Sequence, residues 1–352
     1  MKTMKHLKIV NHASGAVSNY AVRELQKFIE KYSCWDISDA VFAEREIHLS
    51  VDETLPSYCC RIHGVPAEGS SPAVTEVTGG EESSLLNGVY RLLDKMGILF
   101  DINGESLWQP LDMSAADHLD ETFRPFCRNR GIRQHINFPM DISSYHLEEA
   151  QEYIRNMARM GFNAITFHSY NGEWHCYSTD KEEVLAGNFF YGQRYPIPAD
   201  PLMQKGIRNE TVYCIPEVEA SIDNHKKRSD FAIHWLQNVM DTAREAGIRI
   251  TLSVELPDQP MDVLIRMVQG ILDSYPQLDV IEWISPEGGG EPQTISSETA
   301  KAMIDSLFGA DALPEKLRPM LEHPPVALAS TLKNLSRAAE LYRYRDEIFQ
   351  GR

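Results

Sequence analysis

The stretch WISPEGGGE, residues 283–291, places Glu287 and Glu291 on either side of three glycines. Paired carboxyl groups cleave glycosidic bonds, one of them by protonating the leaving oxygen. A carboxyl among apolar groups, such as Trp283, stays protonated near neutral pH. We therefore predict that Glu287 is a catalytic acid and that Glu291 is its partner carboxylate or a substrate contact. The alternatives are a solvated acidic loop for Glu287 and an acidic residue ahead of a helix for Glu291.

Polar side chains also follow two earlier apolar runs. His135 and Asn137 follow RNRGIRQHI, which contains Arg133, and His168 and Asn171 end FNAITFHSYN. Imidazole and amide groups hydrogen-bond sugar hydroxyls, and arginine binds a carboxylate through two parallel bonds. We predict substrate contacts at these five residues. A structural histidine and an interior ion pair are the alternative interpretations.

Residues 170–229 form a segment rich in aromatic residues, among them Trp174. A sugar ring presents apolar C–H faces on which an aromatic ring can stack, so Trp174 is a predicted substrate contact. A small satellite core beneath the segment is the alternative. Glu255 ends the run IRITLSVEL and is a further predicted contact.

Neither a metal nor a cofactor is predicted. His168, His175, Cys176 and His225 lack zinc-site spacing. The glycines of EGGGE are not followed by the Lys and Ser/Thr of a phosphate-binding loop, and two negative charges flank them.

Strands and helices must place these residues together. Strand-like runs at 6–11, 45–51, 57–65 and 72–79, with helical patterns near 17–32 and 83–98, predict a small α+β domain over residues 1–120. From residue 126, strand patterns alternate with helical ones. The predicted strands are 128–136, 162–170, 248–256 and 278–285, and helical patterning alone follows at 296–308 and 327–349.

Such alternation predicts right-handed βαβ units and a parallel sheet. The predicted fold class is α/β: the small domain, then over residues 121–352 the first four βα units of a TIM-type (β/α)8 barrel, interrupted by a long insertion at 170–229. In such barrels the active site lies at the carboxyl ends of the strands, where the candidate residues stand.

Charge and composition indicate which partners and which cellular compartment to expect. The 352-residue chain has a formal net charge of −17, so its field repels nucleic acid. No apolar run approaches the length of a membrane span, and no signal peptide is recognised at the start. Six cysteines without a CxxC pair favour free thiols in a reducing compartment. We expect a cytoplasmic protein, or a periplasmic or secreted one if a leader was removed.

The sequence resembles glycoside hydrolases whose catalytic (β/α)8 barrel follows a small α/β domain, as in family 67 α-glucuronidases and family 20 hexosaminidases. Three stretches carry the resemblance: VTGGEESSLLNGVYRLLDKMGILF, RNRGIRQHI and ARMGFNAITFHSYN. The fourth strand ends in SPEGGGE and lacks the adjacent Asp-Glu pair of the hexosaminidases, so their acetamido-assisted mechanism is not implied.

The resemblance implies a glycosidase acting on O-glycosyl bonds of an oligosaccharide or glycoside, or the N-terminal portion of one. It also favours the end of the fourth strand for the acid. The alternative is a non-catalytic carbohydrate-binding or scaffolding protein on the same fold. Because a half barrel leaves strand edges exposed, we further expect self-association. We also expect no appreciable hydrolysis by the isolated chain, because the opposing carboxylate would come from a later strand across the barrel.

Overall fold

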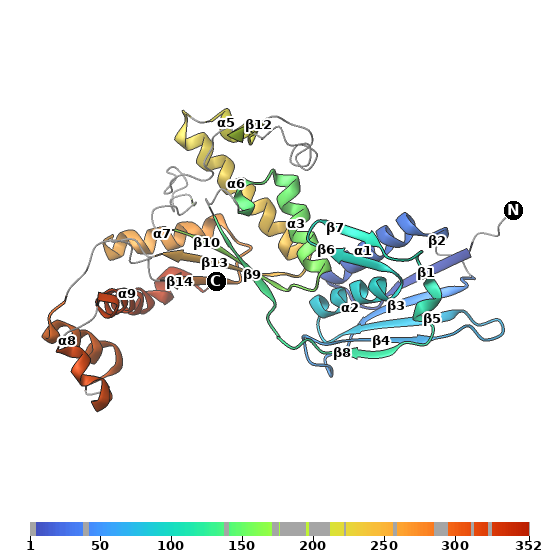
Figure 1. Cartoon of the computed structure of the whole chain (residues 1–352), viewed down its shortest axis with the longest axis horizontal. Helices are drawn as coiled ribbons and strands as arrows, with labels where there is room; N and C mark the ends of the chain where they lie inside the picture. The colour runs from blue at the N-terminus through green and yellow to red at the C-terminus, as the bar shows by residue number, and fades with distance from the viewer. Residues whose placement is uncertain are drawn as a thin grey trace. The chain divides into compact units, whose positions relative to one another are not determined.

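The fold is described from a computed structural model of the chain (Figure 1). The structure describes residues 5–37, 42–136, 141–170, 176, 195–196, 212–221, 223–255, 259–284, 295–310, 313–322 and 326–351. The chain divides into two compact units. Unit 1 comprises residues 1–133, 146–165 and 238–250, and unit 2 comprises residues 134–145, 166–237 and 251–352.

Six strands of unit 1 form one sheet in the order β2-β1-β3-β5-β4-β8. Strands β1, β2, β3 and β5 are mutually parallel, whereas β4 is antiparallel to β5 and β8. The strands are β1 Lys5–Asn11, β2 Trp35–Ile37, β3 Arg45–Val51, β4 Cys60–Val65, β5 Ala73–Gly79 and β8 Asp120–Phe123. This mixed sheet confirms the predicted small α+β domain.

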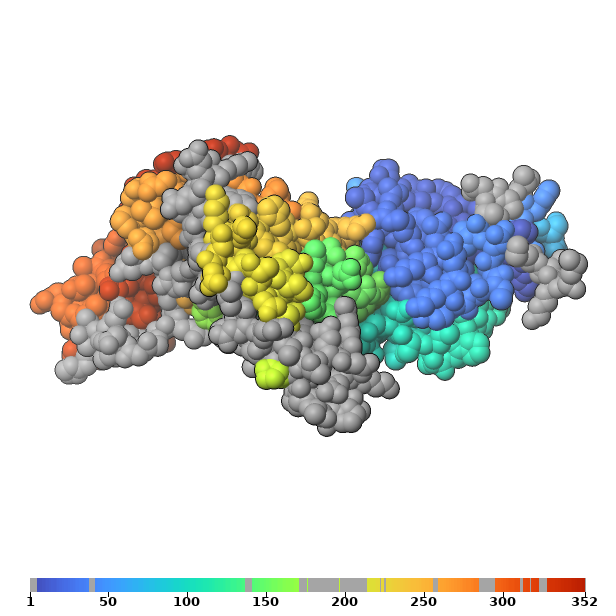
Figure 2. All heavy atoms as spheres, turned by 90° about the horizontal axis from the view of Figure 1, so that it is seen from above, coloured from blue at the N-terminus to red at the C-terminus, as the bar shows by residue number. Residues whose placement is uncertain are grey.

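Unit 1 also contains three whole helices and a hairpin, together with the end of the longer helix α6 His225–Glu245. The whole helices are α1 Ala16–Tyr32, α2 Glu82–Lys95 and α3 Leu147–Arg159, and the hairpin pairs β6 Ile98–Asp101 with β7 Gly104–Leu107; a 3-10 helix spans Met113–Ala116. Phe28 of α1 and Val89 of α2 are fully buried, as the helical spacing of apolar residues predicts. Helix α2 begins with a capping box between Glu81 and Ser84. The N-terminal sheet and helices form a continuous body in the space-filling view (Figure 2).

A buried charged network joins the three helices of unit 1. Arg159 is 3% exposed and pairs with Glu24 (Nε to Oε2, 2.9 Å) and Glu152 (Nη1 to Oε1, 2.5 Å). The hydroxyl of Tyr90 donates to the same Glu24 carboxylate at 3.0 Å. Burial by itself lowers the pKa of Arg159, but the two carboxylates raise it above its usual range. Each charge of the network therefore depends on its partners to offset desolvation.

The second sheet has four strands in the order β14-β13-β10-β9, which is their order along the chain. At one end Asn163 N donates to Arg130 O at 2.9 Å, and at the other Ile136 N donates to His168 O at 2.8 Å, so β9 and β10 run in the same direction. Strands β13 and β14 are also parallel. The strands are β9 Gly131–His135, β10 Ala164–Ser169, β13 Arg249–Glu255 and β14 Val280–Ile284.

A helix connects each strand of this sheet to the next. Helix α3 lies between β9 and β10 in the chain, and the helices that follow are α6 His225–Glu245 and α7 Met261–Ser274. Sequential parallel strands linked by helices confirm the predicted α/β class.

The two faces of this sheet differ in chemistry. Leu252 and Val254 of β13 are buried and project to one face, and Ser253 and Glu255, which alternate with them along the strand, project to the other. Around the apolar pair in unit 2 lie Ile136, Ser169, Leu236, Ile271 and Tyr275. The face that carries Leu252 and Val254 is therefore packed against α6 and α7, and the other face carries the polar residues.

The remaining elements lie in unit 2. They are a 3-10 helix Ile142–Ser144, the hairpin β11 Tyr195–Pro196 and β12 Val212–Tyr213, α5 Pro216–Glu219, α8 Ser297–Phe308, a 3-10 helix Glu315–Leu321, α9 Val326–Arg343 and α10 Arg345–Phe349. Ala300, Ile304 and Leu332 form a small buried cluster. Within the described residues from 295 onward every regular element is helical, as the sequence predicts.

Two of the buried cysteines are poor nucleophiles. Burial raises the pKa of Cys60 to about 11 and that of Cys176 to about 12, so both thiols stay protonated. Cys59, the residue before Cys60, is also fully buried. In the described part of the chain no helix is long and apolar enough to cross a membrane.

We predict that Arg159→Met destabilises unit 1 by about 3–5 kcal/mol, because it leaves the buried Glu24 carboxylate without its cation. Urea unfolding followed by circular dichroism measures the change. Arg23→Met is the matched control, since Arg23 forms an exposed pair with Glu245 whose loss costs at most about 1 kcal/mol. Equal destabilisation by the two variants would contradict a special role for the buried network.

Candidate functional site

Three aromatic side chains gather where β9 and β10 end. His135 is the last residue of β9, His168 is the penultimate residue of β10, and Tyr170 follows that strand. The His135 and His168 ring centroids are 5.0 Å apart at an interplanar angle of 76°, and those of His168 and Tyr170 are 4.7 Å apart at 66°. The carboxyl ends of adjacent parallel strands bring them together.

Hydrogen bonds fix the orientation of both imidazoles. His135 Nδ1 lies 3.0 Å from the Tyr170 hydroxyl, and His168 Nδ1 lies 3.3 Å from Ser253 Oγ. His168 is 2% exposed and Ser253 is fully buried. An imidazole held through one nitrogen presents its other nitrogen in a defined direction.

Asp141 is a site residue that the sequence analysis did not single out. Its carboxylate accepts the backbone N–H of His135 and that of Ile142, the latter at 2.5 Å. Burial raises the pKa of the Asp141 carboxyl, against the lowering effect of these two N–H donors. A half-buried carboxyl with a raised pKa beside a strand end is typical of functional sites. The sequence signal was a lone acid six residues after His135.

The polar face of the sheet carries two glutamates. Glu255, the last residue of β13, is 3% exposed, and Ser253 is paired in register with Glu282 of β14. Because side chains alternate along a strand, Ser253, Glu255 and Glu282 share one face. Glu282 is the second residue absent from the sequence-based candidates, and its signal was a single charged residue within the apolar run VIEWI.

The predicted site residues fall into two groups. His135, His168 and Glu255 lie at the carboxyl ends of their strands, and Arg133 is exposed within β9, two residues before His135. The others lie outside the described residues; they are Glu287, Glu291, Asn137, Asn171 and Trp174. Among the residues that the structure describes, no group of three or more His, Cys, Asp or Glu side chains is arranged to hold a metal ion.

Comparisons with known proteins give structural likeness alone. No protein-family model matches the chain, and no curated protein sequence matches it. The solved structures to which it is similar include glycoside hydrolases, all at low sequence identity. A GH138 enzyme targeting pectin rhamnogalacturonan II has a TM-score of 0.48 and 13% identity over 78% of this chain and 30% of its own.

Two further similar structures carry glycosidase names. The GH20 β-N-acetylhexosaminidase of Streptomyces coelicolor has a TM-score of 0.43 and 10% identity over 77% of this chain and 46% of its own. A mutant β-hexosaminidase of Streptomyces plicatus has a TM-score of 0.42 and 12% identity over 77% of this chain and 45% of its own. This chain spans less than half of each of these three structures. The likeness to family 67 stays a prediction.

We predict that Asp141→Asn lowers the stability of unit 2 by about 1–3 kcal/mol, since an amide N–H₂ would then face a backbone N–H donor. The native carboxyl, whose pKa is raised by folding, also makes stability fall as pH rises from the ordinary aspartate range through the raised value. Thermal unfolding across this pH range measures both effects. A variant that keeps the native pH dependence would contradict this role for Asp141.

Proposed function

We propose that this chain binds a saccharide and that the full protein hydrolyses an O-glycosidic bond by carboxylate acid/base chemistry. The observation that carries the proposal is the cluster of His135, His168 and Tyr170 at the carboxyl edge of a parallel sheet that also bears the buried Glu255. Ligands of parallel α/β folds bind at that edge.

The cluster has the chemistry that sugar recognition needs. Imidazole nitrogens and a phenol hydroxyl donate hydrogen bonds to vicinal hydroxyl groups and accept hydrogen bonds from them. Their rings supply apolar surface for the C–H face of a pyranose, and a buried carboxylate such as Glu255 accepts from sugar hydroxyls. We assign substrate contacts to these residues and, from the sequence, to Arg133, Asn137, Asn171 and Trp174.

Glu287 is the proposed general acid. It follows the last residue of β14, Ile284, by three positions. Protonating the leaving oxygen offsets the charge that develops as the bond to the anomeric carbon breaks and the ring becomes oxocarbenium-like. Glu291 is proposed as the partner carboxylate or as a substrate contact.

The second carboxylate decides the stereochemical outcome. A retaining enzyme needs it about 5–5.5 Å from the acid as a nucleophile, and an inverting enzyme needs it about 6.5–9.5 Å away as a base for water. Glu255 and Glu282 share the polar face of the sheet, which makes them candidates for this position besides Glu291.

We expect Glu287→Gln to lower kcat of the full protein by roughly 10²- to 10⁴-fold on a glycoside with a poor leaving group, because the amide cannot donate the acid proton. Aryl glycosides with good leaving groups should lose less, since they need little protonation. Glu298→Gln, on the exposed first turn of α8, is the matched control. Undiminished turnover of the poor substrate by Glu287→Gln would remove Glu287 from the mechanism.

We expect Tyr170→Ala to weaken saccharide binding by about tenfold or more, which corresponds to about 1.4 kcal/mol for the lost ring surface and the lost anchor of His135. Tyr170→Phe, which keeps the ring, should lose less. Titration calorimetry with a panel of neutral and acidic oligosaccharides measures the affinities.

Tyr342→Ala is the control for this measurement, since Tyr342 is 60% exposed on α9. Binding that is equally strong in Tyr170→Ala and the unchanged protein would contradict the site. Saccharide binding without turnover in the full protein would favour the alternative, a carbohydrate-binding scaffold.

A further inference from the structure

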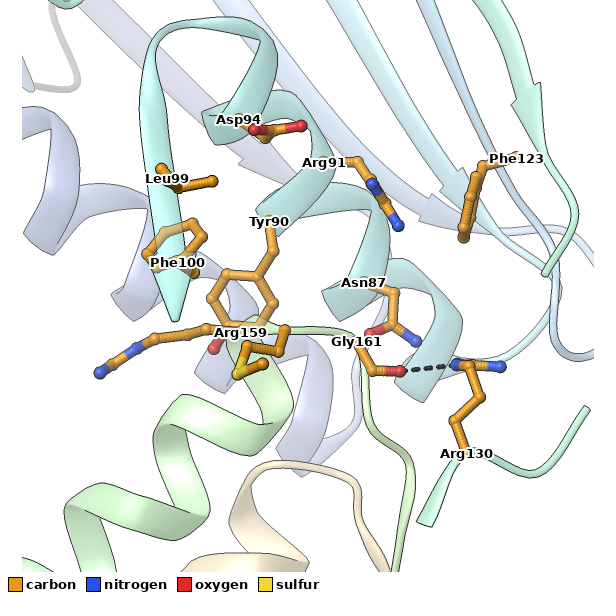
Figure 3. Close-up of a pocket in the computed structure, with 11 residues that line it drawn as sticks. Asn87, Tyr90, Arg91, Asp94, Leu99, Phe100, Phe123, Arg130, Arg159 and Gly161 are labelled. Carbon is orange, nitrogen blue, oxygen red and sulfur yellow. Dashed lines mark hydrogen bonds between the residues drawn. The ribbon is translucent and has the colours of Figure 1, made fainter. Parts of the chain in front are cut away.

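Unit 1 contains a pocket of about 270 Å³ on the outer side of α2 (Figure 3). Its walls come from α2, the β6 strand, the end of β8, the residue before β9 and the end of α3. The side chains that matter below are Arg91, Arg130, Phe123, Asn87 and Asp94. All of them belong to unit 1, and none is part of the sheet-edge cluster.

Arg130 is held rigidly by neutral partners. Its Nε donates to Gly161 O at 2.6 Å, and its Nη1 donates to Cys127 O at 3.0 Å and Arg128 O at 3.2 Å. These backbone carbonyls fix the guanidinium without cancelling its charge. Among these bonds none uses Nη2, so one edge of the group remains available to a ligand.

Arg91 faces the same part of the pocket. Its guanidinium carbon lies 4.1 Å from the centroid of the Phe123 ring. Stacking on a ring uses the flat face of a guanidinium and leaves its N–H edge free for hydrogen bonds in the plane. Figure 3 shows Arg91, Phe123 and Arg130 on the same side of the pocket, with Asn87 between the two arginines.

The two positive charges lack a carboxylate partner in the described part of the chain. Asp94 lines the pocket, but no ion pair joins it to Arg91 or Arg130. Burial and then the positive charge of Arg91 lower the pKa of Arg130. Two cations that repel each other in a concave site are stabilised by an anion between them.

We propose that this pocket binds the oxyanion group of a small ligand, with Arg91 and Arg130 as the two cationic contacts. Carboxylate, sulfate and phosphate each present two oxygens at a spacing that the edge of a guanidinium can bind through two parallel N–H···O bonds. Asn87 adds an amide that donates to the same oxygens or to a neighbouring hydroxyl.

The rest of the pocket selects a ligand with a compact body. Leu99, Phe100 and Met160 form an apolar wall, and Leu99 and Met160 are 49% and 41% exposed. The volume is slightly below the roughly 300–1,000 Å³ of sites for drug-sized ligands. A pocket of this volume fits one anionic monosaccharide, or a molecule of similar size, better than it fits a segment of a polysaccharide.

The test is a titration of the full chain with matched probes at constant ionic strength. The probes are glucose, glucuronate, glucose 6-sulfate and glucose 6-phosphate, which share one body, together with inorganic sulfate and inorganic phosphate. Calorimetry gives the affinities, and the arginine Nε–H resonances in ¹⁵N NMR spectra locate the site. We expect saturable binding of at least one charged sugar, none of glucose, and shifts of the Arg91 and Arg130 resonances.

Arg91→Gln should weaken that binding by roughly 10- to 100-fold, as expected for the loss of a charge-assisted hydrogen-bonded pair. Arg91→Lys should recover only part of it, because an ammonium cannot bind two oxygens in the plane. Arg130→Met should also weaken binding of the charged sugar. Because Arg130 holds backbone carbonyls, this variant could also fold poorly; the Arg91 variants change an exposed side chain and therefore test the site without that defect.

Arg23→Gln is the matched control, since it removes an exposed arginine near a ring, that of Tyr20, in the same unit. If inorganic ions bind as tightly as the charged sugars, the ligand is the free ion; if the sugars bind more tightly, it is a substituted sugar. Absence of saturable binding for every charged probe would overturn the proposal. So would binding that Arg91→Gln leaves unchanged, or equal binding of glucose.

Discussion

The buried pairing of Arg159 with Glu24 is the constraint on which the architecture of unit 1 depends. It joins the last residue of α3 to the middle of α1, and Tyr90 brings α2 to the same carboxylate. Apolar contacts tolerate sliding, whereas a desolvated ion pair is favourable only at one separation and orientation. The pair therefore anchors the last turn of α3. The helix ends there, with Gly161 in the left-handed region (φ 86°), and the chain continues into β10, whose far end carries His168.

The alternation of side chains along β13 places apolar and polar residues on opposite faces of the sheet. Leu252 and Val254 are buried against helices, while Ser253 and Glu255 from the same strand occupy the other face. The apolar face supplies the burial that stabilises the sheet. Ser253 and Glu255 on the other face are buried as well, so hydrogen-bonded partners must offset the desolvation of their polar groups. Residues at the carboxyl ends of the strands then meet, because the strands run in parallel and in register.

Periodicity predicted β1, β3, β4 and β5 of the first sheet and all four strands of the second, since runs such as IRITLSVEL alternate strictly and are bounded by glycine or proline. It also placed His135, His168 and Glu255 at strand ends. It missed β2 and β8, which are too short to show a period. Periodicity shows which face of an element is apolar and not which partner covers it, so neither the Arg159–Glu24 pair nor the grouping of α3 in unit 1 was predictable. Asp141 was missed because its contacts are to backbone N–H groups. The meeting of Arg91 and Arg130 in one pocket was not predictable, because the two residues are 39 positions apart in the sequence.

The net charge of −17 and a pocket for anions are compatible because they act over different distances. At physiological ionic strength the field of distant surface charges is screened beyond about 8 Å. A ligand in the pocket meets the charges of its lining, which are those of Arg91, Arg130, Arg159 and Asp94. Within the described part of the chain, neither Arg91 nor Arg130 is paired with a carboxylate. The acidic surface then slows the approach of anions without deciding their affinity, which depends on direct hydrogen bonds. By the same reasoning, the acidic surface does not repel a neutral glycoside that approaches the sheet edge. There Glu255 and the imidazoles act on it only through direct contacts.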